Sequence, residues 1–389
     1  MSMTKSGRIV AVMAALALGV AALSACSGTG SAPPATASPT VTALSASQSQ
    51  ALQAVLNDAR SALGFPGVIA RVITPEGEWT GSAGATAAGG TTKPGSGDHT
   101  RIGSLTKTMT ATILLQLVGE GKVSLDDPIS KYVPDLPNPD ATLRQVADMT
   151  SGIPSYTLDQ QVTDRYLTSP QDPWTPAQLL DAVRTLPPSF APGQGWQYSN
   201  SNYVALGQFI EKVTGQPLAE VFQKRIFTPL GMTQSSYPSG TDLPAPYLAG
   251  ATLQGATGNT PRDATHFNPT FAASAGQVVS TLDDMTKWAH ALATGDKVLT
   301  PAMQQVRRDS ILTSPPPNSA TAGYGIGIGN RNGWWGHDGD IPGYTTSVYH
   351  SYDHDATLVV LVNSDIGDAK TGAAPAPAVF AGLVKALGW

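Results

Sequence analysis

The sequence contains a single cysteine, Cys26, among its 389 residues, so a disulfide within the chain is excluded. Charged residues are also scarce, at 13% of the chain, and the net charge of −5 comes without any cluster of Lys and Arg. Proteins that bind nucleic acids usually carry such a cluster, because it attracts the phosphate backbone. A nucleic-acid partner is therefore excluded. Hydrophobic residues make up 41% of the chain, which suits a globular protein of one or two lobes with a sizeable core.

A long hydrophobic run is lacking as well. The apolar stretch at residues 9–23 follows Lys5 and Arg8 and is too short to span a bilayer comfortably. This pattern is typical of an export signal, which we expect over residues 1–25. The stretch ends in L-S-A-C at residues 23–26, which resembles a bacterial lipobox. The alternative is an ordinary signal peptide with an incidental cysteine.

The lipobox resemblance implies that Cys26 is lipidated and becomes the new N-terminus. Residues 26–44 are rich in Ser, Gly, Pro, Ala and Thr, and such a segment buries too little apolar surface to fold. We therefore expect a flexible linker there, followed by one domain over residues 45–389. The lipid anchor would hold this domain at the outer face of the cytoplasmic membrane, and a fraction of the protein molecules would be released from it.

Hydrophobic spacing predicts the elements of the first two thirds of this domain. A helix is expected over residues 45–63, then strands over 67–74 and around Trp79, then a Gly- and Thr-rich loop over 85–97. A second helix is expected over 104–119, ended by Gly121. Its predicted apolar face consists of Met109, Ile113, Leu114, Leu117 and Val118. Residues 129–237 carry many prolines and short helical patterns, at 176–186 and 203–214, and predict a mainly helical lobe of about 105–240.

The last third of the chain returns to strand signals. Asn332-Gly333 is a strong hairpin dipeptide between expected strands at 324–329 and 334–339. Two more strands are expected at 344–350 and 356–363, and a closing helix at 374–387. Strands that are joined by hairpins form antiparallel sheets. The predicted fold class is therefore α+β, with an antiparallel sheet flanked by helices and the helical lobe inserted after the first strands.

Three short elements carry the chemistry, and the first is S-L-T-K at residues 104–107. Residues three apart share a helix face, so the Lys107 amine can reach the Ser104 hydroxyl. A serine needs a base within about 3 Å to become a nucleophile, and a lysine can serve where burial lowers its pKa. The Ser104 amide at the helix N-terminus can also stabilise an oxyanion. Alone, the pattern fits an N-cap serine beside a surface lysine better than a catalytic pair.

The second element is Y-S-N at residues 198–200, and the third is H-D-G at 337–339. Tyr198 can act as a general base where neighbouring cations help it to lose its proton, and Asn200 can bond both a lysine and a substrate carbonyl. Gly339 leaves room for a substrate to approach the strand. The amide of Asp340 can then be a second oxyanion donor. A lone histidine such as His337 is more often structural than catalytic, and the second element alone is a polar loop.

In this order and at these separations, S-x-x-K, Y-x-N and H-x-G resemble the motifs of the serine β-lactamase-fold family. This family includes class C β-lactamases, D-Ala-D-Ala carboxypeptidases, D-aminopeptidases and esterases. The similarity extends over residues 51–389. The surrounding segments that match are R-I-G-S-L-T-K at 101–107, G-K-V-S-L-D-D-P at 121–128, M-T-S-G-I-P at 149–154, A-P-G at 191–193, S-A-G-Q-V-V-S-T at 274–281, Y-G-I-G at 324–327 and G-H at 336–337.

The resemblance implies a serine hydrolase that acts on an amide or ester through an acyl-enzyme. Ser104 would be acylated, Lys107 and Tyr198 would share proton transfer, and Asn200 would orient Lys107 and the substrate. His337 would stand where many relatives have lysine. The amides of Ser104 and Asp340 would form the oxyanion hole. The substrate would be a small molecule or a peptide, such as a peptidoglycan stem peptide. We expect a monomer and neither a metal nor a cofactor.

The third motif departs from the family pattern at Asp338 and Asp340. Relatives that bind penicillins or D-Ala-D-Ala have hydroxyl residues there, which help to hold a substrate carboxylate. Two carboxylates facing the pocket would repel an anionic terminus by on the order of 1 kcal/mol or more. We therefore expect these residues to favour a neutral or cationic substrate over a β-lactam. His337 in place of lysine also predicts activity that depends on pH between roughly 6 and 8.

Two other hypotheses compete with the hydrolase. A catalytically weak peptidoglycan- or penicillin-binding lipoprotein would keep the pocket, but the retained Ser104 and Lys107 argue against it. A different hydrolase chemistry lacks its motifs, because neither G-x-S-x-G nor H-E-x-x-H occurs. His350 and His354 flank a turn-like stretch and are interpreted as solvated residues rather than as zinc ligands.

Overall fold

The computed structural model describes residues 42–389, so Cys26, the predicted signal at 1–25 and most of the predicted linker lie outside the described residues. Its main sheet is antiparallel and has seven strands in the order β2-β1-β11-β10-β9-β8-β7. The antiparallel sheet flanked by helices confirms the predicted fold class. The strands are β1 (Gly67–Thr74), β2 (Gly77–Gly84), β7 (Ala322–Tyr324), β8 (Gly329–Arg331), β9 (Trp334–Ile341), β10 (Tyr344–Ser351) and β11 (Ala356–Val362).

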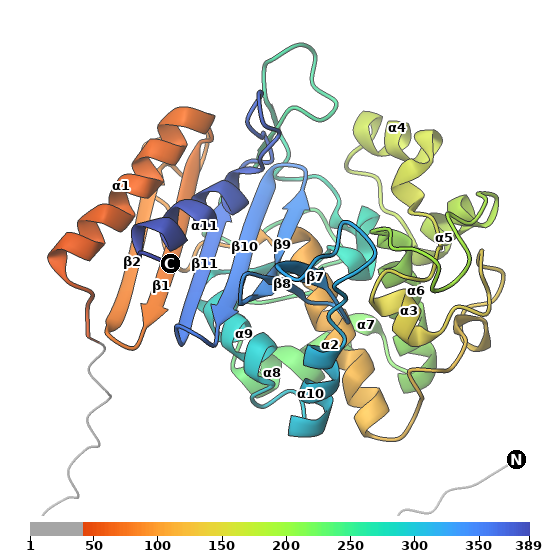
Figure 1. Ribbon diagram of the computed structural model, residues 1–389. Coiled ribbons are helices and arrows are strands. Elements are labelled where there is room, and N and C mark those ends of the chain that lie inside the picture. Colours follow the sequence, from red (N-terminus) through yellow and green to blue (C-terminus); the bar gives the residue numbers. More distant parts are fainter. Residues whose placement is uncertain (1–41) are drawn as a thin grey trace, which may run out of the picture. The chain divides into compact units, whose positions relative to one another are not determined.

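Two helices lie side by side on one face of this sheet, α1 (Ala46–Leu63) and α11 (Pro375–Ala386) (Figure 1). Leu56 of α1 is fully buried against alternate strand residues such as Val68 and Val360, whereas Ile69 and Leu361 face the opposite core. The central strands are therefore buried on both faces, which explains their nearly continuous apolar sequences. The predicted helices and strands of this layer are confirmed.

The opposite face of the sheet is covered by α2 (Thr106–Gly119) and α9 (Leu282–Thr294) (Figure 1). The five residues predicted to form the apolar face of α2 all lie in or against the core, but residues 106–115 are all buried, so this part of the helix has no solvent face. The helix is packed between the sheet and α6 (Asn200–Thr214). Its polar residues are satisfied internally, as Thr108 and Thr112 donate to the carbonyls of Leu105 and Thr108.

The chain from residue 106 to residue 230 contains helices and no strand. Besides α2 and α6, these helices are α3 (Leu143–Ala147), α4 (Gln160–Thr168), α5 (Pro176–Arg184), α7 (Leu218–Phe222) and α8 (Thr228–Leu230). Two small sheets follow from pairing of β3 (Thr100–Arg101) with β6 (Val279–Ser280) and of β4 (Ala251–Thr252) with β5 (Arg262–Asp263), and α10 is Pro301–Asp309. Within residues 42–389 no helix combines the length and the apolar character needed to cross a bilayer.

The strand predicted at residues 324–329 is wrong. β7 ends at Tyr324, and residues 325–328 form a turn in which the Gly325 amide donates to the Ile328 carbonyl at 2.8 Å. Gly327 has a φ of 62°, and a Cβ at this position would lie 2.3 Å from the Cβ of Ala111 on α2. Glycine is therefore required where this turn packs on α2. β8 follows the turn and pairs with β9 through the predicted hairpin at residues 332–333.

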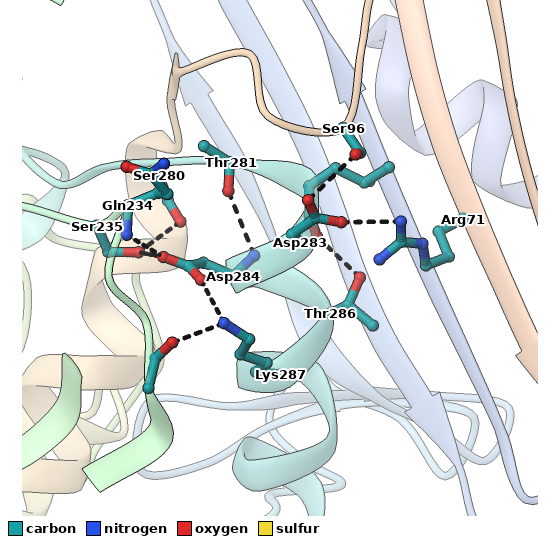
Figure 2. A network of polar contacts seen from close by, with 12 residues as sticks. Arg71, Ser96, Gln234, Ser235, Ser280, Thr281, Asp283, Asp284, Thr286 and Lys287 are labelled. Atoms are coloured by element: carbon teal, nitrogen blue, oxygen red, sulfur yellow. Dashed lines mark hydrogen bonds and ion pairs between the residues drawn. The ribbon is translucent and has the colours of Figure 1, made fainter. Parts of the chain in front are cut away.

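A buried polar network holds the start of α9 (Figure 2). Asp284 is 1% exposed and accepts hydrogen bonds from the Gln234 amide at 2.8 Å and from Ser235 Oγ at 2.9 Å. Lys287 Nζ completes the set at 2.8 Å. The adjoining strand β6 pairs with β3, which leads directly into Ser104. The network thereby braces the segment that carries the predicted nucleophile.

Candidate active site

The structure brings the three predicted motifs together between α2, α6 and β9. Ser104 lies in a 3₁₀ turn, residues 103–105, directly before α2. Gly103 has a φ of 53°, and a Cβ there would lie 2.7 Å from the Asp340 amide nitrogen. The glycine therefore lets the turn of Ser104 contact the backbone of β9. Asn200 is the first residue of α6, which begins three residues earlier than predicted, and His337 lies within β9.

Lys107 is fully buried at the centre of this site. Its Nζ lies 2.9 Å from Ser104 Oγ and 2.8 Å from both Asn200 Oδ1 and the Ala275 carbonyl. Burial lowers the pKa of Lys107 well below its usual range, which favours the neutral amine. A neutral amine has two protons, and both are taken by acceptors that cannot donate, Asn200 Oδ1 and the Ala275 carbonyl. The lone pair is left facing the Ser104 hydroxyl, which is the arrangement of a general base.

Tyr198 keeps its proton in this environment. Burial raises the pKa of Tyr198, and its hydrogen bond with Ser104 lowers it by less. The sequence suggested that neighbouring cations would help Tyr198 to lose this proton. That expectation is wrong, because the pKa of Tyr198 is raised, and burial lowers the pKa of both neighbouring cations, Lys107 and His337. Tyr198 is thus protonated beside the Ser104 hydroxyl, and its role in proton transfer stays a prediction.

His337 is buried and bonded on both ring nitrogens. Its Nδ1 bonds the Asp338 carbonyl, so Nδ1 carries the proton, and Nε2 lies 3.1 Å from the Tyr324 hydroxyl. Burial lowers the pKa of His337 to about 3. The prediction that this residue titrates between pH 6 and 8 is therefore wrong. His337 remains a neutral residue that positions Tyr324.

The space beside Gly339 is filled by the protein itself. A Cβ at this position would lie 2.0 Å from the Ile102 carbonyl oxygen and 2.3 Å from Thr346 Oγ1. The clearance predicted for a substrate at Gly339 is thus used instead to pack the nucleophile segment onto β9. The oxyanion hole formed by the amides of Ser104 and Asp340 stays a prediction, and the contact between Gly103 and Asp340 brings the two segments together.

The two aspartates of the third motif have different surroundings. Asp338 forms an ion pair with Arg331 at 2.6 Å and accepts a hydrogen bond from Ser347 Oγ at 2.7 Å. The pKa of Asp340 is raised to about 7, first by desolvation from the surrounding protein and then by the negative charges of Asp365 and Asp338. Solvent still reaches Asp340, which works against this shift. The predicted repulsion of anions by both carboxylates is therefore corrected, since Arg331 neutralises Asp338.

Two cavities meet at the predicted nucleophile, and Ser104, Tyr198 and Asp340 line both. The larger has a volume of about 410 Å³ and the smaller about 280 Å³. The larger is also lined by Trp196, Asn318, Tyr324, Arg331, His337 and Asp338. The smaller is also lined by Tyr156, Thr157, Asn200, Gln254, Phe271 and Ile341.

Sequence reasoning missed three groups at this site. The Ala275 carbonyl could not be found from the sequence, because every residue offers the same backbone acceptor. Arg331 is the last residue of β8, and no local sequence pattern marks it as part of the site. Tyr324 belongs to the Y-G-I-G segment, which did point to this region but not to a bond with His337. No group of three or more His, Cys, Asp or Glu side chains suited to a metal ion occurs within residues 42–389.

Comparisons of the sequence identify relatives of known type. The sequence profile of the Beta-lactamase family matches residues 51–380. The putative penicillin-binding protein PbpX of Bacillus subtilis is 29% identical over 276 residues, which are 70% of this chain and 63% of that protein. A D-aminopeptidase of Cereibacter sphaeroides is 26% identical over 278 residues, which are 69% of this chain and 51% of that protein. This chain thus spans less than two thirds of the length of these curated relatives.

Comparisons of the fold identify solved structures of similar length. A D-stereospecific amidohydrolase from a Streptomyces species has a TM-score of 0.75 and 32% identity, and the match covers 83% of this chain and 96% of that one. The D-amino acid amidase of Ochrobactrum anthropi, complexed with L-phenylalanine amide, has a TM-score of 0.77 and 28% identity over 88% and 98% of the two chains. The hydrolase EstCE1, at 17% identity and a TM-score of 0.71 over 88% and 98%, shares the fold.

Proposed function

The chain belongs to the Beta-lactamase family, and from this premise we propose that it is a serine hydrolase that cleaves amides of D-amino acids with a free amino group. The observation that carries the proposal is the contact of 2.9 Å between the buried Lys107 amine and Ser104 Oγ. A free amino group on the substrate is favoured because Asp340 lines both cavities and its carboxylate has no neighbouring cation within residues 42–389 that stabilises it. A substrate ammonium group could fill that role.

The reaction begins when Ser104 gives its proton to Lys107 and its Oγ bonds to the substrate carbonyl carbon. The amides of Ser104 and Asp340 stabilise the oxyanion that forms. Tyr198 then protonates the leaving nitrogen and is reprotonated from Lys107, so that the C–N bond breaks and the acyl-enzyme remains. Water, activated by the same lysine, hydrolyses the ester and releases the acid.

The D-amino-acid amide class is supported by the relatives and by the charges at the site. The solved relatives at 28% and 32% identity are a D-amino acid amidase and a D-stereospecific amidohydrolase. The substrate ammonium would be attracted by Asp340 when this carboxyl is ionised. Esters are the second candidate substrate, because an ester carbonyl would meet the same nucleophile and form the same acyl-enzyme.

A catalytically weak peptidoglycan- or penicillin-binding protein is the alternative function. A binding protein has no need of a desolvated lysine, which costs stability unless its neutral form is used. The hydrogen bonds of Lys107 to Asn200 and to the Ala275 carbonyl instead orient it toward Ser104. The geometry therefore favours catalysis over binding alone.

Steady-state kinetics test the proposal directly. The substrates are D- and L-phenylalanyl 4-nitroanilide, a 4-nitrophenyl ester and nitrocefin, with Ser104→Ala as the control. We expect kcat/KM for the D-anilide to exceed that for the L-anilide by about 10-fold or more, which needs a difference of only about 1.4 kcal/mol in transition-state stabilisation. We also expect nitrocefin turnover to be weak. Efficient nitrocefin turnover, or a Ser104→Ala variant that keeps full activity, would overturn the proposal.

We also propose that the protein is a monomer held at the outer face of the cytoplasmic membrane through lipidated Cys26. The L-S-A-C sequence at residues 23–26 supports the anchor. In cells fed with a labelled fatty acid, the wild-type protein should carry the label and sediment with membranes. The Cys26→Ser variant should lose both properties, and a labelled variant would contradict the anchor. Light scattering of the detergent-free domain over residues 45–389 should give the mass of one chain.

A further inference from the structure

The larger cavity contains one ion pair, between Arg331 and Asp338. Arg331 Nη1 lies 2.6 Å from Asp338 Oδ2, and the other carboxylate oxygen accepts from Ser347 Oγ at 2.7 Å. The guanidinium also lies over the Tyr349 ring, 5.8 Å from its centroid. Both members of the pair line the same cavity of about 410 Å³ as Ser104. The pair is therefore part of the substrate environment and not a distant surface feature.

The charges around the two cavities give this pair its importance. Arg331 is the only Arg or Lys among the residues that line them in the described part of the chain. His337 adds no positive charge, because burial keeps it neutral. A substrate carboxylate that enters the larger cavity thus meets a single cation, and that cation is already bound by Asp338.

We propose that Asp338 masks Arg331 and thereby makes the ion pair a specificity determinant against leaving groups that end in a carboxylate. Such a leaving group would have to displace Asp338 from Arg331, and the partly buried Asp338 would then lose its charge partner. Neutral leaving groups, such as ammonia or an uncharged amine, do not pay this cost. The inference rests on the proposed function and specifies which amides are cleaved.

The pair contributes little to the stability of the fold, so it can be altered. The Arg331 side chain is 51% exposed and that of Asp338 21%, and ion pairs as exposed as this one are worth about 0–1 kcal/mol. In Asp338→Asn the side-chain carbonyl oxygen can still accept from Ser347, while the negative charge is removed. The substitution therefore frees Arg331 without removing the packing of β9.

The test compares two anilides with the same D-phenylalanyl group. One has 4-nitroaniline as its leaving group, and the other has 5-amino-2-nitrobenzoate, which adds a carboxylate. The measured quantity is the ratio of kcat/KM for the carboxylated substrate to that for the neutral one. We expect Asp338→Asn to raise this ratio roughly 10-fold, because Arg331 can then pair with the carboxylate of the leaving group. Salt at about 0.5 M should reduce this gain by screening the two charges.

Matched variants show whether the freed guanidinium causes the change. The double variant Asp338→Asn with Arg331→Gln should return the ratio to about that of the wild type, because no cation remains. Arg331→Gln alone should lower the ratio, because Asp338 is then unpaired. Asp58→Asn on α1, an exposed site outside both cavities, should leave the ratio unchanged.

Two results would overturn the inference. One is an unchanged ratio in folded Asp338→Asn, with folding checked by its melting temperature. The other is loss of both activities in that folded variant, because the pair would then serve catalysis itself. If Asp338→Asn does not fold, an unchanged ratio in Arg331→Gln has the same meaning. A wild-type enzyme that hydrolyses neither anilide, yet is acylated at Ser104 by a fluorophosphonate, would instead refute the proposed amide substrate, and the inference would fall with it.

Discussion

Replacing Lys107 with methionine isolates its role as a base. The side chain is fully buried, and methionine fills a similar unbranched volume without the nitrogen. The substitution leaves Asn200 Oδ1 and the Ala275 carbonyl without their donor, at about 1–3 kcal/mol each. Removal of a desolvated amine offsets part of this cost. We therefore expect a folded protein whose free energy of unfolding is reduced by about 1–3 kcal/mol.

The expected loss of activity is larger than this loss of stability. A positioned general base contributes about 10²–10⁴ in rate, which corresponds to about 3–5 kcal/mol of transition-state stabilisation. Both kcat/KM for a 4-nitrophenyl ester and the rate of acylation by a fluorophosphonate should fall by that factor in Lys107→Met. The control is Lys122→Met, which removes an exposed lysine that pairs with Glu120. An acylation rate within about 5-fold of the wild type would refute the assignment of Lys107 as the base, because it is far below the expected factor.

Three further predictions concern pH and stability. The raised pKa of Asp340, about 7, means that its carboxyl becomes anionic as pH rises toward this value. KM for a D-amino-acid amide should therefore fall between about pH 5 and about pH 7, where the substrate amine, with an ordinary pKa of about 7.7–8, is still protonated. Asp340→Asn should remove this dependence, and an unchanged profile in the variant would contradict the ammonium contact. His337 has a pKa of about 3, so His337→Gln should alter the level of activity without moving the profile between pH 6 and 8, as measured with a neutral ester. Asp284→Ala should reduce the free energy of unfolding in urea by about 3 kcal/mol, because it leaves buried donors unpaired. Asp283→Ala, whose side chain is 46% exposed, should cost less than about 1 kcal/mol, and equal losses would contradict the role of the buried network.

Much of the fold follows from local sequence patterns. The capping box of Ser45 with Gln48 and the left-handed Gly64 mark the ends of α1, where spacing also predicted them. The dipeptide at residues 332–333 forms its hairpin, because both residues adopt positive φ. The missed turn at 325–328 depends on how closely Gly327 approaches Ala111, a contact between distant segments that no local pattern encodes.

The sequence predicted which residues would lie together at the candidate site, but not the surroundings that set their charge states. The order of the motifs was enough to bring Ser104, Lys107 and Asn200 into one hydrogen-bonded group. The state of His337 depends on its complete burial, and that of Asp338 depends on a partner from the neighbouring strand. Both are tertiary effects that no local sequence pattern encodes. Because the pKa of His337 is about 3 and that of Asp340 about 7, the pH dependence near neutrality is now expected from Asp340 and not from His337.

Mass spectrometry of the acylated protein tests the central claim most directly. The wild-type protein, treated with a fluorophosphonate or with a slowly deacylated D-phenylalanyl ester, should gain a single adduct on the peptide that contains Ser104. The Ser104→Ala variant should gain none and should lose hydrolysis of the D-anilide. An adduct on a different residue, or a Ser104→Ala variant that hydrolyses the anilide at the wild-type rate, would contradict an acyl-enzyme at Ser104.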